Sequence, residues 1–388
     1  MPTVPATPST SSGPAGGLAA PAGDAASPAG GTTASPTGET GSPAREAAPA
    51  RDTGSPSGTA SPTRGNTAPA WDVLRPRRAE GRVFLVTGGN AGIGYFVAEQ
   101  LSASGATVVL GCRDPAKAEA ARGSIRSRVP GARVRSVRLD LADLASLGPA
   151  VASLPVARLD AVVHNAGVAL DDPPRRETGA GHELMFGTNH LGHFALTAHL
   201  MPLLSAAPAA RVVTVGSFAA KSERLDLDDL QSRHDYRPQR TYGRSKLAQM
   251  YFGLELDRRL RALGSTTESV VVHPGGALDS LTPSRPPVHV RAAGARLYAW
   301  PAALLLQGKH AGAWPAVRAV LDPDVRGGQV WGPHRFGLRG APRHEPVWSH
   351  LADPAAAARL WDACRDLCGV DPVGSVLPRA GRADASGG

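Results

Sequence analysis

The sequence has few cysteines, few lysines and no long apolar run, and each shortage excludes a class of protein. Three cysteines in 388 residues cannot build a disulfide scaffold, and such scarcity is typical of a reducing compartment. No run of 18 apolar residues occurs, so we expect no membrane-spanning helix. The N-terminus also lacks a basic segment followed by an apolar core, which a secretory signal would need. These shortages predict a soluble, cytoplasmic protein.

Only four of the 42 basic residues are lysines, so arginine dominates a formal net charge of +9. Residues 1–70 contain four acidic and three basic side chains, which leaves +10 for the rest of the chain. A joint excess of Arg, Ala, Gly and Pro is typical of a compositional bias. The basic charge therefore does not by itself indicate a polyanionic partner, and we expect no binding of nucleic acid.

The first part of the chain also lacks the apolar content that a core requires. Residues 1–70 consist almost wholly of Pro, Ala, Gly, Ser and Thr, which cannot offset the entropy of ordering. We predict a disordered tail over residues 1–79, although a misassigned start of translation would leave the same composition. Residues 80–375 are predicted to form one domain, with a substrate lid or a surface loop at 281–310, and 376–388 a flexible C-terminus.

Short apolar runs alternate with helical patterns through the predicted domain. The runs fit strands buried on both faces, as in a parallel sheet. We predict strands at 83–86, 107–110, 134–139, 159–164, 211–215, 269–272 and 328–331. We predict helices at 92–104, 115–128, 143–153, 181–204, 241–263, 311–321 and 354–367. The alternation predicts an α/β fold, a single Rossmann-like doubly wound parallel sheet with helices on both faces.

A glycine-rich segment follows the first predicted strand and opens the first predicted helix. Glycines at such a turn let a pyrophosphate approach main-chain N–H groups, and the helix N-terminus favours its negative charge. The spacing is Gly-x-x-x-Gly-x-Gly. The segment predicts a dinucleotide site that includes Gly88, Asn90, Gly92, Ile93 and Gly94.

The end of the second predicted strand bears on the choice of cofactor. NAD enzymes usually place a carboxylate here for the ribose hydroxyls, but this position holds Cys112, followed by Arg113. A guanidinium can pair with a 2′-phosphate, which favours NADP(H). In the alternative, Asp114 binds the ribose, Arg113 is an ordinary surface residue, and NAD(H) is the cofactor.

Tyr242 and Lys246 stand at i and i+4 of a predicted helix, one turn apart on one face. An unperturbed tyrosine has a pKa near 10. A nearby ammonium stabilises the phenolate and lowers this pKa, which would make Tyr242 a usable general acid or base.

With these motifs and further segments in the family's order, the chain resembles a short-chain dehydrogenase/reductase over about residues 80–280. The insert 225–230, Tyr236 and the segments 111–114 and 245–248 resemble the branch of retinol dehydrogenases and WW-domain oxidoreductases. That branch usually prefers NADP(H). By resemblance, the cofactor site gains Asp140, Leu141, Asn165, Ala166, Gly167, Pro274 and Gly275, and the catalytic set gains Asn189 and Ser217.

The resemblance implies an oxidoreductase that transfers a hydride between NADP(H) and an alcohol or carbonyl substrate. Ser217 would bind the substrate oxygen, and Tyr242 would exchange a proton with it. Lys246 would lower the tyrosine pKa and bind the nicotinamide ribose, and Asn189 would hold a water linking Lys246 to solvent. The alternative is a regulatory or scaffold protein that binds the cofactor without turnover. Many relatives pair through the helices at 181–204 and 241–263, so a homodimer is also expected as one outcome.

Several residues depart from the family pattern or suggest other sites. Asp279 stands where the family often has a threonine, and its carboxylate could either accept from the carboxamide or repel the diphosphate. His164 replaces the first Asn of the family's Asn-Asn-Ala-Gly segment. We expect His190 and His193 to pack near the active site, and Cys364 and Cys368 to be small buried residues. No metal site is expected.

Overall fold

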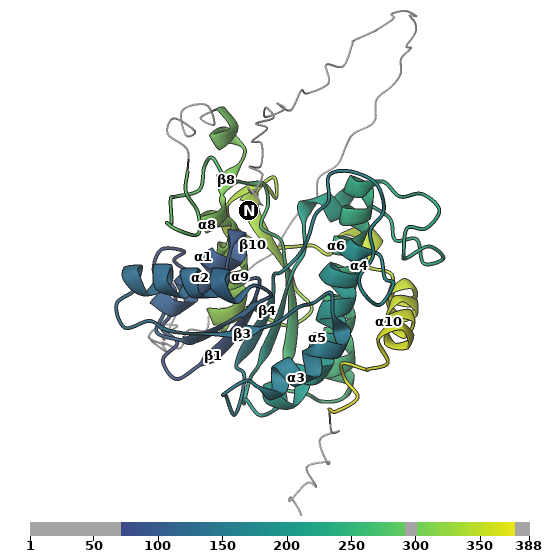
Figure 1. The fold of residues 1–388 in the computed structure, drawn as a ribbon, viewed down its shortest axis with the longest axis horizontal. Coiled ribbons are helices and arrows are strands. Elements are labelled where there is room, and N and C mark those ends of the chain that lie inside the picture. The colour runs from purple at the N-terminus through teal and green to yellow at the C-terminus, as the bar shows by residue number, and fades with distance from the viewer. Residues whose placement is uncertain (1–70, 292–300, 377–388) are drawn as a thin grey trace, which may run out of the picture. The chain divides into compact units, whose positions relative to one another are not determined.

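The computed structural model describes residues 71–291 and 301–376. Its strands form an eight-stranded sheet in the order β10-β9-β6-β5-β4-β1-β2-β3 (Figure 1). All neighbouring strands from β3 to β9 run parallel, and only β10 is antiparallel to its neighbour β9. From β1 the chain adds β2 and β3 on one side and then β4, β5, β6 and β9 on the other, so the strand order reverses between β1 and β4. Open α/β sheets bind ligands in the crevice at such a point.

The central strands of the large sheet are buried apolar runs, as a sheet covered on both faces requires, whereas the edge strands β3 and β10 are partly exposed. The strands of this sheet are β1 (Val83–Thr87), β2 (Thr107–Cys112), β3 (Arg133–Arg138), β4 (Ala161–His164), β5 (Arg211–Val215), β6 (Glu268–Val272), β9 (Val330–Arg335) and β10 (Arg339–Glu345). A separate parallel pair joins β7 (Ala277–Leu278) to β8 (Gln307–Gly308).

The helices lie between the strands in the chain. The α-helices are α1 (Gly92–Ala103), α2 (Pro115–Arg128), α3 (Leu147–Ala152), α4 (Leu184–Phe186), α5 (Gly192–Ser205), α6 (Pro238–Ala262), α8 (Lys309–Gly312), α9 (Trp314–Leu321) and α10 (Pro354–Cys368). Short 3₁₀ turns are η1 (Leu144–Ser146), η3 (Phe218–Ser222), η4 (Pro301–Leu304) and η5 (Ser349–Leu351), and η2 (Gly187–Leu191) is a π-turn.

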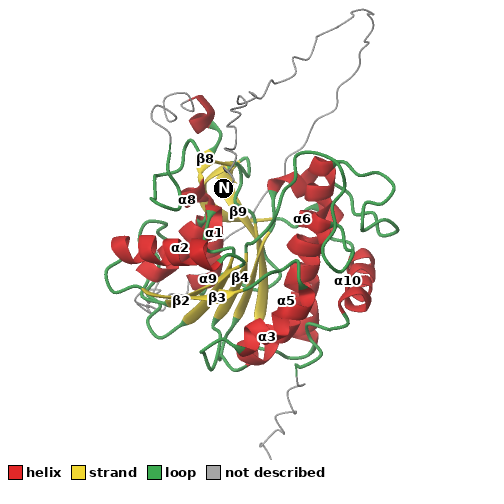
Figure 2. Ribbon diagram, in the orientation of Figure 1, coloured by secondary structure: helices red, strands yellow, loops and turns green. Residues whose placement is uncertain are grey.

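Two apolar cores lie on the two faces of the sheet, and Figure 2 shows the helices on either side of the strands. α1, α2 and α9 cover one face, while α5, α6 and α10 cover the other. Alternate strand residues divide between the cores: Val212 of β5 belongs to one, Val213 and Val215 to the other. The predicted doubly wound sheet with helices on both faces is confirmed.

Some element boundaries differ from the prediction for local reasons. The helix expected from 181 begins at Leu184, because the Glu183 carboxylate accepts hydrogen bonds from the Met185 and Phe186 N–H groups and caps it. The helix expected at 311–321 is divided in two near Pro315, which has no N–H to donate. β10 was not predicted, because this edge strand contains Pro342 and has no apolar alternation.

The described chain begins before the predicted domain start at residue 80. Ala79 is buried and its N–H donates to the Ser104 carbonyl, and the guanidinium of Arg318 lies 5.7 Å from the Trp71 ring centroid. The rest of the predicted tail, residues 1–70, lies outside the described residues. So do 377–388 of the predicted C-terminus and 292–300 of the predicted lid.

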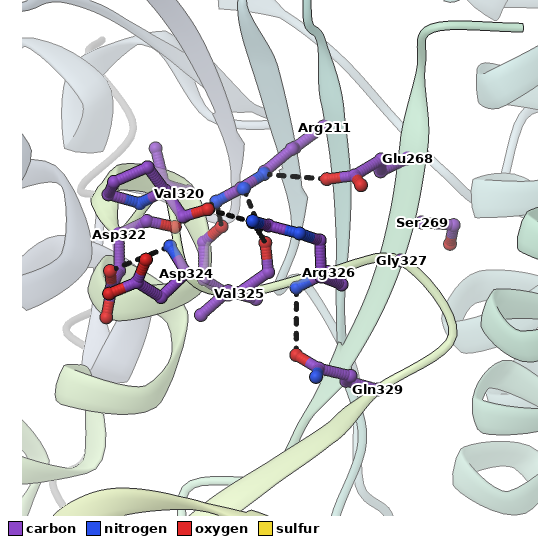
Figure 3. A network of polar contacts seen from close by, with 12 residues as sticks. Arg211, Glu268, Ser269, Val320, Asp322, Asp324, Val325, Arg326, Gly327 and Gln329 are labelled. Atoms are coloured by element: carbon purple, nitrogen blue, oxygen red, sulfur yellow. Dashed lines mark hydrogen bonds and ion pairs between the residues drawn. The ribbon is translucent and has the colours of Figure 1, made fainter. Parts of the chain in front are cut away.

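The amino edge of the sheet is fixed by Arg211, the first residue of β5 (Figure 3). Its guanidinium donates to the carbonyls of Ala319, Asp322 and Val325 at 2.7–2.8 Å, and Nε lies 3.4 Å from the Glu268 carboxylate. Ala319 belongs to the last turn of α9, whose exposed carbonyls favour a cation. One side chain therefore joins β5, β6 and the end of α9.

Candidate active site

The turn between β1 and α1 leaves open space in front of a helix N-terminus. Gly88 and Gly92 have φ of +65° and +57°, in the left-handed region that favours glycine. A Cβ on Gly92 would meet no atom within 4 Å, whereas a Cβ on Gly94 would lie 2.3 Å from Asn165 Nδ2. No side chain among the described residues caps α1, and its first turn has no acidic residue. This cradle fits a diphosphate, which main-chain N–H groups and the helix dipole would hold.

A pocket at this turn brings together many of the predicted cofactor residues. It lies at the carboxyl ends of β1, β2 and β4 and is lined by Gly88, Asn90, Arg113, Asp140, Leu141, Ala166 and Gly167, together with Thr87, Lys117, Val168 and Thr188. Ile93 does not line it; this residue is half-buried and packs against the apolar core on the α1 face of the sheet. Sequence reasoning missed Lys117, whose only signal was its place in the first turn of α2.

The end of β2 holds the residues that distinguish the two cofactor alternatives. The Asp114 carboxylate accepts hydrogen bonds from the Ala116 and Lys117 N–H groups at 2.9 and 3.1 Å and so caps α2. Burial raises the pKa of the Cys112 thiol to about 12. Arg113 is exposed at the rim of the pocket. One oxygen of the acid that could bind the ribose is therefore engaged in the cap, while Asp114 and the exposed Arg113 both line the pocket.

Thr87 ties the first turn to the segment after β4. Its hydroxyl accepts from the N–H groups of Asn165 and Ala166 at 2.9 and 3.0 Å, and Asn165 Nδ2 donates to the Thr87 carbonyl at 3.0 Å. Asn165 thus shapes the pocket from behind and does not line it.

The predicted catalytic residues meet at the carboxyl ends of β4 and β5. Interaction with Ser217 lowers the pKa of the Tyr242 phenol, but burial has the larger effect and raises it. The Lys246 ammonium donates to the Val215 carbonyl at 3.0 Å and to Gln249 Oε1 at 2.9 Å. Burial lowers the lysine pKa to about 8. The expected lowering of the tyrosine pKa by Lys246 is therefore absent here, because burial dominates and the ammonium is bound elsewhere.

Asn189 lies in η2, a short π-helical segment, and such segments are often found at functional sites. Its Oδ1 accepts from the Val168 N–H at 2.7 Å, and its Nδ2 donates to the Val168 carbonyl and to Ser245 Oγ, both at 2.9 Å. The side chain therefore joins the loop after β4 to α6, the helix of Tyr242 and Lys246.

A buried polar cluster behind Lys246 was not predicted as a unit. His193 Nδ1 lies 2.9 Å from the Asn189 carbonyl, which can only accept, so Nδ1 carries the hydrogen. His193 Nε2, 2.9 Å from Thr87 Oγ1, then accepts from that hydroxyl. Burial lowers the His193 pKa to about 3, so the ring is neutral. Gln249 Nε2 donates to the His164 carbonyl at 3.2 Å, and the His164 ring stacks on His193 at 4.7 Å.

The buried histidines His190 and His193 contact different parts of the structure. His193 contacts the site as expected, while His190 Nε2 lies 3.0 Å from Cys364 Sγ. Gln249 was not singled out from the sequence, and its only signal was the i+3 spacing from Lys246, which places both on one helix face. Within residues 71–291 and 301–376, no group of three His, Cys, Asp or Glu side chains could hold a metal ion.

Pro274 and Gly275 follow β6 and lie beyond the residues that line the pocket. Gly275 has φ of +68°, and a Cβ there would lie 2.5 Å from the Leu338 carbonyl, so only glycine fits. The Pro274 carbonyl accepts from Gln307 Nε2 at 2.9 Å. Asp279 pairs with Lys309 Nζ at 2.6 Å, so this carboxylate is neutralised by its own chain.

The chain is similar to proteins of known class. A sequence profile described as short chain dehydrogenase matches residues 82–227. Retinol dehydrogenase 14 of Mus musculus is 32% identical over 309 residues, covering 76% of this chain and 88% of that protein. Polyprenol dehydrogenase of Mus musculus is 37% identical over 287 residues, covering 72% of this chain and 82% of that protein.

Solved structures agree with these relatives. An uncharacterized protein from Mycobacterium paratuberculosis has a TM-score of 0.63 at 33% identity, covering 78% of this chain and 98% of that one. An active-site complex of RhlG with NADP from Pseudomonas aeruginosa has a TM-score of 0.50 at 26% identity, covering 65% of this chain and 94% of that one.

Among the helices in the described part of the chain, none is both long and apolar enough to cross a membrane.

Proposed function

The chain belongs to the short-chain dehydrogenase family, and from this premise we propose that it transfers a hydride between NADP(H) and an alcohol or carbonyl substrate. The observation that carries the proposal is the interaction of Tyr242 with Ser217 at the end of β5, where the buried Lys246 donates to the Val215 carbonyl and Asn189 bonds to Ser245 of the same helix. A proton donor, a second hydroxyl and a buried cation thus converge at the ends of β4 and β5.

Each residue of the set has a physical role in the proposal. The bound nicotinamide would supply the hydride chemistry. Ser217 and Tyr242 hold the substrate oxygen between two hydroxyls, and Tyr242 gives it a proton in reduction or takes one in oxidation. Lys246 stabilises the phenolate once its ammonium turns from Val215 and Gln249 toward the phenol and the ribose.

Asn189 keeps its predicted role in proton supply as part of the proposal. Its carbonyl already accepts from His193, so the expected water would use the second lone pair of that oxygen. Its side chain, bound to Val168 and Ser245, fixes the distance between the loop after β4 and the catalytic helix.

The preference for NADP(H) rests on Arg113 and Lys117, two cations at the rim of the cofactor pocket. Asp114 also lines this pocket, but its Oδ1 caps α2, and this capping role competes with binding of the ribose hydroxyls. The cradle before α1 and the pocket residues Asn90, Asp140, Leu141, Ala166 and Gly167 would hold the rest of the dinucleotide, with Ile93, Gly94, Asn165, Pro274 and Gly275 shaping its edges.

The substrate class is an apolar alcohol, aldehyde or ketone of middle size. The lid segment 281–310 is rich in Pro, Ala, Leu and Val, and two relatives carry the names of retinol and polyprenol dehydrogenases. We keep a cytoplasmic location in the proposal, because all three cysteines are free thiols. The proposal also includes a homodimer in which the two copies pair through α5 and α6.

Turnover against a panel of apolar aldehydes and ketones, retinal included, tests the proposal with NADPH and NADH in parallel. We expect NADPH oxidation and its loss in Tyr242→Phe, with NADPH binding, measured by fluorescence, retained. If NADPH binds and no carbonyl in the panel is reduced, the alternative of a regulatory or scaffold protein replaces the proposal. Equal or better use of NADH would refute the role of Arg113.

A further inference from the structure

The turn between β9 and β10 presents an aromatic side chain to solvent in an unfavourable conformation. Phe336 is 80% exposed and has φ of +55°, a backbone region that bulky residues seldom adopt. Its neighbour Gly337 has φ of +70°, and a Cβ there would lie 3.1 Å from the Phe218 ring. The turn is thus held against the loop that follows Ser217, while the Phe336 side chain gains no burial in return for its strain.

Further apolar side chains are exposed beside this turn. Leu304 and Leu305, at the end of η4, are 67% and 55% exposed and line one recess together with Phe336. Seven large apolar side chains are exposed among residues 71–291 and 301–376, and three of them meet here. Single exposed apolar residues are ordinary, but a cluster of them marks an interaction surface.

The remaining lining of the recess is one histidine and three arginines. It consists of His334, Arg335, Arg339 and Arg343. In the described part of the chain no carboxylate lies within ion-pair distance of these three arginines, whereas Arg175, Arg285 and Arg318 each pair with an acid. Arg339 donates to the Ala303 carbonyl and so ties the turn to η4. The surface therefore combines apolar tips with unpaired positive charge.

We propose that this surface, formed by Leu304, Leu305, Phe336, Arg335, Arg339 and Arg343, docks on an anionic lipid bilayer. An apolar tip that enters the headgroup region, flanked by arginines that bind lipid phosphates, is the chemistry of an interfacial anchor. A symmetric contact with a second copy would bring these arginines against the same arginines and is therefore opposed by repulsion. The docking does not depend on the proposed function.

Co-sedimentation of the full-length protein with vesicles tests the docking. We expect binding to vesicles that contain phosphatidylserine, and much weaker binding to vesicles of phosphatidylcholine alone. Each basic residue near an anionic surface contributes about 1 kcal/mol, so Arg335→Gln and Arg343→Gln should each weaken binding about fivefold at physiological salt. Arg128→Gln, at the exposed end of α2, removes the same charge elsewhere and should have little effect.

Phe336→Asn separates docking from folding. Asparagine tolerates positive φ, so we expect the melting temperature to hold or to rise by about 2 °C, while vesicle binding falls at least fivefold. Leu367→Asn on α10 is the matched control, because Leu367 is exposed and lies outside the surface.

Three results would overturn the docking. They are wild-type protein that stays in the supernatant, a Phe336→Asn variant that binds like wild type, and a loss in Arg128→Gln as large as that in Arg335→Gln. Self-association in sedimentation velocity that Phe336→Asn abolishes, without lipid binding, would instead assign the surface to a second copy.

Discussion

A cation lies at each end of β5, Arg211 at the amino end and Lys246 of α6 at the carboxyl end, and the two cations have different bonding partners. At the amino end, Arg211 donates to three main-chain carbonyls and lies beside the Glu268 carboxylate. At the carboxyl end, the Lys246 ammonium meets only neutral acceptors, the Val215 carbonyl and the Gln249 amide oxygen. One charge is fully paired, while the other is buried without a counter-ion.

The difference separates a residue that holds the fold from one suited to chemistry. Burial lowers the pKa of both groups, but a guanidinium does not lose its proton in proteins, whereas the Lys246 pKa falls to about 8. A group whose pKa is shifted toward working pH by burial is a candidate for function. The sheet thus has a paired cation at its amino edge and, at its carboxyl edge, an unpaired cation beside the proposed catalytic residues.

Replacing the unpaired cation should have the largest effect on turnover. We expect Lys246→Met to lower kcat/KM about a thousandfold, within the range that positioned acid–base groups supply. The free energy of unfolding at pH 7 should not fall, because methionine removes a buried charge. Steady-state kinetics and thermal unfolding of the same preparations measure both quantities. A variant that loses stability along with activity would show that the ammonium holds the fold as Arg211 does.

Replacing the paired cation should reverse this pattern. Arg211→Met leaves three carbonyls and Glu268 without their partner, which should lower the free energy of unfolding by about 4 kcal/mol. We expect kcat of the folded fraction to stay within about twofold, since Arg211 lies at the edge away from the site. Urea unfolding measures the free energy of unfolding, and active-site titration gives the concentration of folded enzyme from which kcat is calculated. Arg211→Lys is the matched control, and it should recover only part of the loss because an ammonium lacks the guanidinium fork. A large loss of kcat in fully folded Arg211→Met would remove the distinction between the edges.

The sequence predicted the functional edge far better than the structural one, for a physical reason. The turn at Gly88 to Gly94 and the pair Tyr242 and Lys246 are local patterns, so their residues meet whenever the strand or helix forms. Arg211 could not be recognised, because its carbonyl partners arise about a hundred residues later, at the end of α9.

Long-range packing explains the other omissions at the site itself. Asn189 and His193 lie four residues apart in one helical run, but Thr87 lies about a hundred residues earlier, and only the fold shows that the neutral imidazole meets it. The tyrosine pKa was expected to fall because Lys246 is near in sequence. Burial raises it instead, and burial is a property of the whole domain.

The pH dependence of stability should expose the smaller consequence of the unpaired charge. The Lys246 pKa is about 8 in the folded protein against 10.5 for an unperturbed lysine. Between these values the unfolded chain binds a proton that the folded chain has released, so this group makes stability rise with pH. The shift corresponds to about 3 kcal/mol between pH 8 and pH 10.5. The difference in unfolding free energy between wild type and Lys246→Met should change by this amount across that window, measured by urea unfolding at a series of pH values. Arg211→Met should run parallel to wild type over the same range, because the guanidinium does not titrate there. If the unfolding free energies of wild type and Lys246→Met changed equally with pH, the ammonium would keep its proton across this range and would be paired as well as Arg211.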